Sequence, residues 1–314
     1  MREPPTGVGD SDVLELVRRC WSVEVDAVEH LPIGFGAHHW AASVAGLRHL
    51  FVTLDQLGTR HSAASLEAAY AGAAVLAGSG LEFVLASRST PDGRYTVPLA
   101  GGVMSCTPWR EGTVVGDGAI TDADLATDNA AMLARLHTAD PPPEIPQWRP
   151  RVGPDFAAEL RSRLAEPWRT GPYGEAARRA LTDRLTAIDG WTARYWTLTE
   201  QAHERPWVAT HGEPHTRNQL RTVDGILLVD WESLSSSPRE RDLSPLVESG
   251  YADLVEPDWA MVELFDVEWR LDEIAQYAGW FATPHVGSAS DRVAWGGLQF
   301  ELDRPDRSSR QAPD

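Results

Sequence analysis

A short segment in the last third of the chain carries the side chains best suited to chemistry. Glu213 offers a carboxylate, Asn218 an amide, and Asp230 a second carboxylate at the end of the apolar run 226–229. Phosphoryl transfer requires such a set, because a carboxylate orients and deprotonates the attacking hydroxyl while oxygen ligands hold Mg²⁺. The spacing allows one loop and one hairpin to gather the three side chains around a single ion. An ordinary turn before a buried strand explains Gly212, but not an amide with a carboxylate on either side of it.

At these residues the sequence resembles the aminoglycoside phosphotransferase and choline kinase-like family, relatives of the protein kinases that phosphorylate small molecules. The family pattern is His-Gly-Asp, four further residues, Asn, and an apolar strand that ends in Asp, an aromatic residue and an acid. The chain departs from this pattern at Glu213, where the family usually has the catalytic Asp. The resemblance implies that Glu213 is the catalytic base and that His211 steadies its loop. It also implies a Mg²⁺ site formed by Asn218, Asp230 and Glu232.

The chain contains no lysine, and all 28 of its Lys+Arg residues are arginine. Arg217, between the expected base and the amide, has a permanent charge and is the candidate for the γ-phosphate of ATP or GTP. In the strand expected at 50–55, Thr53 stands where the family carries a phosphate-binding lysine. A neutral hydroxyl does not replace a charge-assisted contact, which contributes roughly 1.5–3 kcal/mol. We therefore expect that Arg48, Arg60 or the metal compensates, that nucleotide binding is weak, or that the chain is an inactive relative.

The segment before this strand predicts a hairpin that folds over the nucleotide phosphates. Gly34 and Gly36 flank an aromatic residue, and glycine lets backbone N–H groups approach an anion. An ordinary hairpin turn would have the same composition. A helix is expected at 62–77, with Glu67 where the family presents an acid to the missing lysine. Glu67 would instead hold an arginine or face solvent.

The last strand of the small lobe and its hinge are expected at 103–109, where backbone groups would bind the edge of an adenine or guanine. Met104 and Cys106 are assigned to this nucleotide site, with Met104 against the ring. Met104 is equally well explained as a core residue. Strand-like segments at 81–85 and 95–97 precede it, which favours an antiparallel sheet in this half of the chain.

The segment after the metal-binding strand continues the resemblance. Asp242 stands in a Pro-x-x-x-Asp-Leu pattern and is expected to brace the catalytic loop through His211 or an arginine. The acidic and aromatic stretch 248–282 lies where the family lines its acceptor pocket with acids that bind amines. The residues assigned to the acceptor are Asp242, Glu248, Asp266 and Trp269. A solvated helix face with tryptophans packed inward accounts for most of this stretch equally well.

Composition narrows the class of protein. A chain of 314 residues with 42% hydrophobic and 24% charged residues is typical of a soluble globular enzyme. The net charge of −18 disfavours nucleic acid as a partner and would attract a cationic acceptor, although it could serve solubility alone. Cys20 and Cys106 fit free thiols in a reducing cytoplasm, and no export signal or membrane-spanning run is found.

These observations predict an α+β, protein-kinase-like fold with two lobes. The small lobe, expected at 1–108, would hold a five-stranded antiparallel sheet, and the mainly helical large lobe would span 109–304 before a disordered tail at 305–314. The expected activity is Mg²⁺-dependent transfer of a γ-phosphate to a hydroxyl of an aminoglycoside-like or other natural product, by a monomer or homodimer. Two alternatives stay open: a metabolic kinase for a sugar, amino alcohol or nucleoside, and an inactive, ligand-binding relative.

Overall fold

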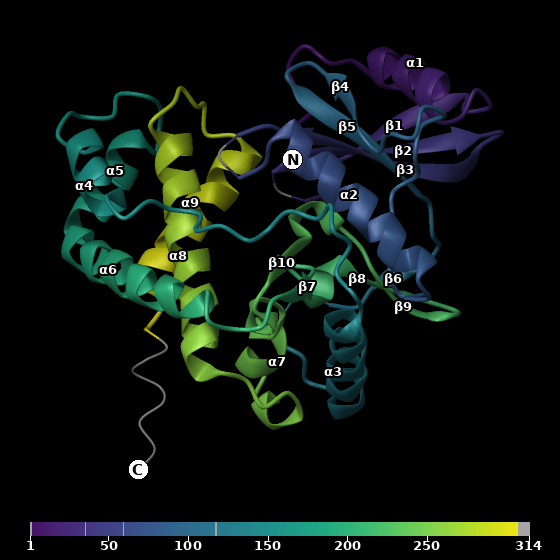
Figure 1. Ribbon diagram of the computed structural model, residues 1–314. Coiled ribbons are helices and arrows are strands. Elements are labelled where there is room, and N and C mark those ends of the chain that lie inside the picture. Colours follow the sequence, from purple (N-terminus) through teal and green to yellow (C-terminus); the bar gives the residue numbers. More distant parts are fainter. Residues whose placement is uncertain (1, 35, 59, 117, 307–314) are drawn as a thin grey trace. The chain divides into compact units, whose positions relative to one another are not determined.

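The computed structural model describes residues 2–34, 36–58, 60–116 and 118–306 (Figure 1). The chain divides into two compact units, one formed by 1–148 with 206–256 and the other by 149–205 with 257–314. This division does not follow the expected boundary after residue 108, because the segment with the candidate site belongs to the unit that contains the large sheet. The expected tail lies outside the described residues from position 307 onward.

The first unit contains a five-stranded sheet in which every neighbouring pair is antiparallel, as the sequence predicts. The strand order is β1-β2-β3-β5-β4. The strands are β1 (Ala27–Leu31), β2 (Ala37–Val44), β3 (Leu47–Gln56), β4 (Val97–Leu99) and β5 (Gly102–Pro108). Residues 81–85 do not form a strand, and Val84 makes only an isolated parallel bridge with Leu228.

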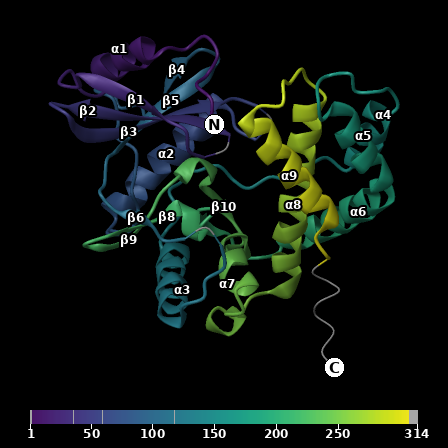
Figure 2. The same cartoon turned by 180° about the vertical axis from the view of Figure 1, so that it is seen from behind.

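The two faces of this sheet differ in character. Helix α1 (Asp10–Cys20) covers one face, and β3 sends Leu50, Val52 and Leu54 into the core beneath it. Because side chains alternate along a strand, Thr53 and its alternate neighbours point to the other face. Figures 1 and 2 show α1 and α2 on opposite sides of the sheet. Thr53 and Asp55 therefore lie on the α2 side.

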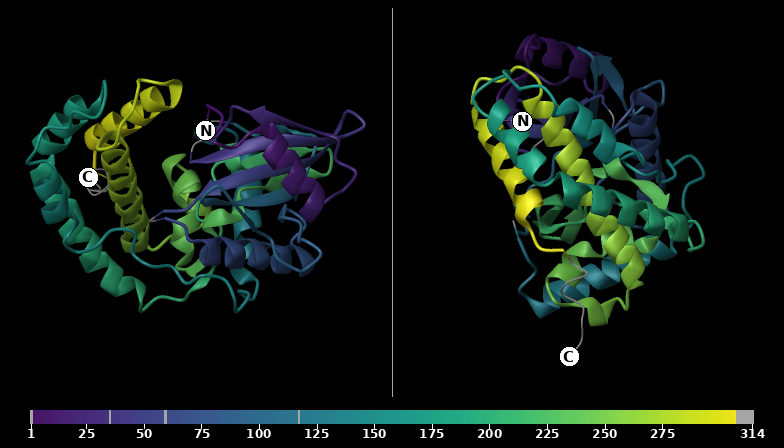
Figure 3. Two further views of the ribbon diagram at one scale, coloured as in Figure 1. Left: turned by 90° about the horizontal axis from the view of Figure 1, so that it is seen from above. Right: turned by 90° about the vertical axis from the view of Figure 1, so that its left-hand side faces the viewer.

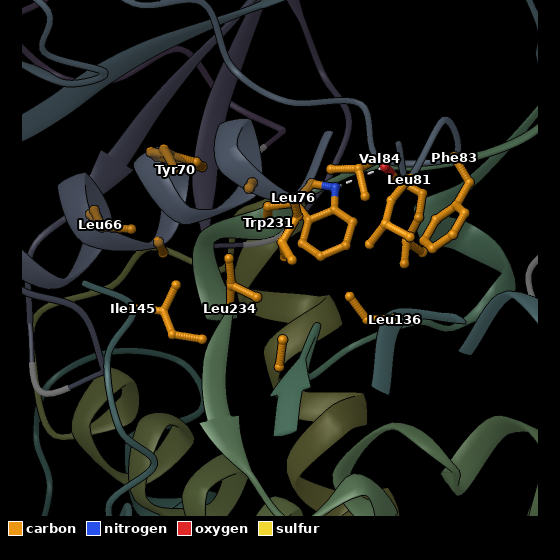
Figure 4. Close-up of a cluster of buried hydrophobic side chains, with 14 of the residues drawn as sticks. Leu66, Tyr70, Leu76, Leu81, Phe83, Val84, Leu136, Ile145, Trp231 and Leu234 are labelled. Carbon is orange, nitrogen blue, oxygen red and sulfur yellow. Dashed lines mark hydrogen bonds between the residues drawn. The ribbon is translucent and has the colours of Figure 1, made fainter. Parts of the chain in front are cut away.

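Helix α2 (Ala63–Gly78) begins at Ser62, whose hydroxyl accepts the backbone N–H of Ser65. Its apolar face joins a core with residues from distant parts of the first unit (Figure 4). Trp231 is at the centre of this core, and its indole N–H donates to the Leu228 carbonyl at 2.8 Å. This packing fixes residues 231–234 against α2.

The remaining elements of the first unit include those that carry the candidate site. Helix α3 (Ala123–Thr138) is capped by Asp122, whose side chain accepts the backbone N–H groups of Asp124 and Leu125. The short strands are β6 (Thr113–Val114), β7 (Val208–Thr210), β8 (Gln219–Thr222), β9 (Gly225–Leu228) and β10 (Ser235–Ser237). The short helices are η1 (Thr216–Asn218), η2 (Trp231–Ser233), η3 (Arg239–Asp242), α7 (Ser244–Glu248) and η4 (Ala252–Leu254). β8 and β9 form the expected hairpin between Asn218 and Asp230.

The second unit is helical (Figure 3). Its helices are α4 (Phe156–Arg163), α5 (Gly174–Asp183), α6 (Leu185–Ala202), α8 (Trp259–Phe281) and α9 (Ala289–Asp303). Residues 174–202 form two helices that are separated at Arg184, and the helix of the acidic stretch 248–282 begins only at Trp259. Within the described ranges, none of the helices combines the length and apolar character needed to span a bilayer.

Candidate active site

His211 is a buried brace of the loop that carries Glu213. Its Nε2 donates to the Val229 carbonyl at 2.8 Å, and its Nδ1 accepts the backbone N–H of Glu213 at 3.1 Å. One ring nitrogen is thus a donor and the other an acceptor, which is the pattern of a neutral imidazole. Burial lowers the pKa of His211 to about 4, in agreement with that pattern. His211 steadies the loop as expected and connects it to the end of the β8–β9 hairpin.

Asp242 holds the same loop from the other side. Its carboxylate accepts the backbone N–H groups of His211 at 2.9 Å and Gly212 at 2.7 Å, and His137 of α3 donates to it at 3.0 Å. Burial alone would raise the pKa of Asp242, but the hydrogen bond and charge of His137 outweigh it and hold the pKa below its usual value. The expected bracing role is confirmed. Asp242 is fully buried, so its assignment to the acceptor pocket is wrong.

Gly212 is required at its position for two reasons. Its φ is +97°, and a Cβ there would lie 2.4 Å from the guanidinium of Arg241. Arg241 donates to the hydroxyl of Thr210 and to the carbonyl of Ser233, so it links β7 to the segment after Asp230. A side chain at position 212 would displace this arginine, and the glycine of the motif therefore permits close packing beneath the loop.

The structure brings the side chain of Asn218 to the backbone of Glu213. The Asn218 side chain donates to the Glu213 carbonyl at 3.0 Å, and the Asn218 carbonyl accepts the N–H of Val229 at 2.9 Å. Asn218 thereby ties the base-bearing loop to the residue before Asp230. Its side-chain nitrogen is used within the loop, so the side-chain oxygen is the atom that suits a cation.

Asp230 adopts an unusual backbone conformation between β9 and η2. Its φ and ψ are 71° and 61°, a left-handed conformation that is uncommon for residues other than glycine. The flanking residues are fixed, since Val229 binds both Asn218 and His211 while Trp231 is buried. Strained residues that their surroundings hold in place are concentrated at functional sites. This conformation directs the Asp230 side chain toward the other acidic groups.

Carboxyl groups accumulate around Asp230. Burial raises the pKa of Glu232 well above its usual value, and a hydrogen bond with Asp230 and the charges of Asp55 and Glu213 raise it further. Carboxylates so close together repel one another, and a divalent cation relieves that repulsion. Among the described residues, no group of three or more His, Cys, Asp and Glu side chains is arranged to hold a metal. The donor set that suits Mg²⁺ includes the amide of Asn218.

Polar residues that do not belong to the motif lie on the face of the sheet toward α2. The ring Nδ1 of His39 on β2 lies 3.3 Å from the Thr53 hydroxyl, and Tyr70 of α2 donates to Asp55 at 2.8 Å. Burial raises the pKa of Asp55 to about 7, against the hydrogen bond from Tyr70, and the charge of Asp230 raises it further. The alternation of polar and apolar residues along 50–55 was the available signal for Asp55.

Three residues assigned to the nucleotide site have other roles. Met104 and Cys106 are fully buried in the core under α1, on the face of the sheet away from Thr53, so their side chains cannot contact a ring on the Thr53 side. Glu67 is half-buried and, within the described ranges, is bonded to backbone groups rather than to an arginine. It accepts the backbone N–H groups of Tyr95 and Thr96, both at 2.8 Å, and so anchors the entry to β4 on α2.

The remaining predicted residues are dispersed. Gly34 and Gly36 are exposed with φ of +72° and +94°, and the aromatic residue between them is outside the described residues. Arg217 of η1 is exposed. Glu248 is exposed at the end of α7 and accepts the hydroxyl of Ser244.

Asp266 and Trp269 both belong to α8 of the second unit. Asp266 is paired with Arg304 at 2.7 Å and its side chain is largely buried, so it is not available to bind an amine. Its assignment to the acceptor is therefore wrong. Trp269 is partly exposed on the same helix.

Comparisons with known proteins agree with this geometry. Protein StrN of Streptomyces griseus is 28% identical over 255 residues, which cover 76% of this chain and 77% of that protein. The solved spectinomycin phosphotransferase in complex with ADP and spectinomycin has a TM-score of 0.72, at 14% identity and 96% coverage of both chains. Amicoumacin kinase in complex with AMP-PNP, Ca²⁺ and its antibiotic has a TM-score of 0.57, at 12% identity and 94% coverage of both chains.

At such low identities the solved structures establish the fold, which is that of the small-molecule kinases. The sequence profile of the phosphotransferase enzyme family matches residues 28–286, which is most of the chain and includes both the glycine turn and the catalytic loop. The protein therefore belongs to the phosphotransferase enzyme family and is a phosphotransferase with an alcohol group as acceptor.

Proposed function

We propose that this enzyme transfers the γ-phosphate of ATP or GTP to a hydroxyl group of an aminoglycoside-like or other aminated natural product. The observation that carries the proposal is the meeting of Glu213, Asn218 and the segment around Asp230 through shared hydrogen bonds. The spectinomycin and amicoumacin kinases, whose solved structures share the fold, support an antibiotic acceptor. The net charge of −18 favours an acceptor that carries amines.

In this proposal the chain supplies the base and the cation ligands. Glu213 accepts the proton of the acceptor hydroxyl as it attacks the γ-phosphate, while Asn218, Asp230 and Glu232 provide the oxygen ligands for Mg²⁺. A bound Mg²⁺ would neutralise charge on the phosphates. The glutamate is one methylene longer than aspartate, and the hydrogen bond from its backbone N–H to His211 fixes the position from which that longer side chain extends.

The base is tested by replacing Glu213 with glutamine, which keeps the shape but cannot take the proton. We expect kcat to fall by roughly 10²–10⁴-fold, while the Kd for Mg²⁺-nucleotide changes little. Glu24→Gln, an exposed carboxylate outside the loop, is the matched control and should keep full activity. A Glu213→Gln enzyme with wild-type turnover would show that Glu213 is not the base.

The acceptor is found by thermal shift, because a ligand that binds only the native state raises its melting temperature. Nucleotides with Mg²⁺ are crossed with aminoglycosides, spectinomycin and amicoumacin, and with amino alcohols and sugars as a second panel. Stabilisation and phosphorylation by an antibiotic support the proposal. If only an amino alcohol, sugar or nucleoside is phosphorylated, the enzyme is a metabolic kinase and the proposed substrate class is wrong.

A further inference from the structure

The loop that carries Glu213 is held at its C-terminal end by two amide side chains that follow one another in the chain. The carbonyl of Glu213 accepts a side-chain N–H of Asn218 at 3.0 Å. The carbonyl of the next residue, Pro214, accepts a side-chain N–H of Gln219 at 2.9 Å. Asn218 belongs to the motif, whereas Gln219 lies outside it and makes the same kind of contact one residue further along the loop.

The side chain of Gln219 is oriented by helix α3. Its Nε2 also donates to Oδ1 of Asn129, whose Nδ2 donates to the Leu125 carbonyl at 2.8 Å. Gln219 and Asn129 are both almost completely buried. Because a backbone carbonyl can only accept, each amide has one orientation that satisfies its carbonyl partner. The network therefore has a single arrangement, which connects the Pro214 carbonyl to α3.

The backbone of Gln219 is held as firmly as its side chain. Gln219 is the first residue of β8, where it pairs with Leu228 of β9. Its N–H donates to the Thr216 carbonyl, and its own carbonyl accepts the N–H of Val115 at 3.0 Å. A group that is supported by rigid elements is positioned more narrowly than one on a free loop. Gln219 therefore presents its amide to the loop from a fixed position.

Glu213 needs such support more than an aspartate would. Glutamate has one more rotatable bond than aspartate, so its carboxylate reaches more positions from a given backbone. Pro214 restricts the backbone of the residue before it and has no N–H of its own. Its carbonyl is thus the only backbone group through which a hydrogen bond can hold the loop at this position. A displacement of a reacting group by about 1 Å lowers a rate by roughly 10²-fold.

We propose that Gln219, oriented by Asn129, is a positioning residue for the catalytic base. By holding the Pro214 carbonyl, it fixes the point from which the Glu213 carboxylate reaches the acceptor hydroxyl. This inference rests on the proposed function, in which Glu213 is the base, and it names two residues outside the motif. The competing explanation is a pair of buried amides that satisfy each other and contribute only to stability.

The test is a double-mutant cycle that combines Gln219 with the base. Gln219→Leu keeps an apolar side chain of similar size and removes both donors. We expect kcat to fall roughly 10–100-fold, while the KM and Kd for Mg²⁺-nucleotide stay within about threefold of the wild type. In the Glu213→Gln protein the same change should alter kcat by less than about threefold, because the base through which Gln219 acts is already absent. A purely structural role would change kcat by the same factor in both backgrounds.

Thr96→Val is the matched control. The Thr96 hydroxyl is buried and donates to Glu67 at 2.6 Å at the entry to β4, in the same unit as the loop. The change removes one buried hydrogen bond without touching the catalytic loop, so kcat should stay at the wild-type value. Thermal unfolding shows that each variant is folded at the assay temperature.

Asn129→Leu is a milder variant that keeps the inference testable where Gln219→Leu unfolds. It removes only the acceptor that orients Gln219, and we expect kcat to fall roughly threefold to tenfold, again only when Glu213 is present. Equal losses with and without Glu213, or wild-type kcat in both variants, would overturn the inference while the proposed function stands. A Glu213→Gln enzyme with wild-type turnover would overturn the proposed base and this inference together.

Discussion

In the catalytic loop, charged side chains hold the backbone, whereas on the sheet face buried polar side chains hold one another. Asp242 accepts two backbone N–H groups of the loop, and Arg241 donates to the strand and the segment on either side of it. On the sheet face, His39 contacts Thr53 and Tyr70 contacts Asp55. The backbone of the loop is thus held by side chains other than the Glu213 carboxylate, which is the group proposed to accept the proton.

The difference has a consequence for ligand binding. A carboxylate that receives several hydrogen bonds and faces a cation is stable when buried, as the lowered pKa of Asp242 shows. Asp55 and Glu232 lack such support, and burial raises the pKa of each. The hydrogen bonds that hold the loop are all made within the chain, whereas the acidic group around Asp230 would need a bound cation to relieve its repulsion.

The largest effect is expected where the loop brace is removed. Asp242→Ala leaves the N–H groups of His211 and Gly212 without their acceptor and His137 without its partner, all of them buried. Removing one partner of a buried charged pair costs about 3–5 kcal/mol. Urea unfolding measures the loss, with Asp253→Ala, a carboxylate of η4 in the same unit, as a control. A loss below about 1 kcal/mol would show that the loop does not depend on this brace.

The same residue predicts a pH dependence with a definite sign. Because the folded state lowers the pKa of Asp242, its contribution to stability is fully present above the unfolded value of about 3.9 and is lost as the pH falls through the lower folded value. The difference in free energy of unfolding between wild type and Asp242→Asn should be present in full near pH 5, where His137 can carry its charge, and shrink below about pH 4. A difference that instead grows in acid would contradict the assignment of the shift.

Residues 211–230 were predictable because their arrangement is local. The motif residues are close together in the sequence. A loop followed by a hairpin leaves few conformations in which Glu213, Asn218 and Asp230 would be far from one another. Asp242 was also predictable, because its segment follows the hairpin directly. In each case the contact partners are near in the chain or belong to a recognisable pattern.

The sheet face was harder to predict because its contacts depend on register. Thr53 faces His39 and Ser105 only because of the lengths of the intervening turns, and Met104 consequently points away from the site. A shift of one residue in the pairing would reverse this arrangement. Likewise, no glycine or proline at position 184 indicates in the sequence that the helix is interrupted there.

A smaller loss is expected on the sheet face when the donor to Asp55 is removed. Tyr70→Phe keeps the ring in the core but leaves a fully buried carboxyl group without its 2.8 Å hydrogen bond. The expected loss of stability is about 1–3 kcal/mol, and it is limited because Asp55 can take up a proton. Tyr95→Phe, a half-buried tyrosine at the edge of the same core, is the control. Equal stabilities of Tyr70→Phe and wild type would show that this hydrogen bond has no net effect.

The smallest effect on stability, and the sharpest test of the comparison, is expected for Thr53→Val. This change keeps the branched shape in β3 and removes only the hydroxyl that lies 3.3 Å from His39, at a cost of about 0.5–1.5 kcal/mol. Urea unfolding measures this loss, since the imidazole keeps its packing on Phe51 when the hydroxyl is removed. Thr107→Val, on the same face of β5 and bonded to Ser87, supplies the matched loss of a hydroxyl away from His39. If the two variants lose the same stability, the contact between the Thr53 hydroxyl and His39 contributes no more than an ordinary hydroxyl contact on this face.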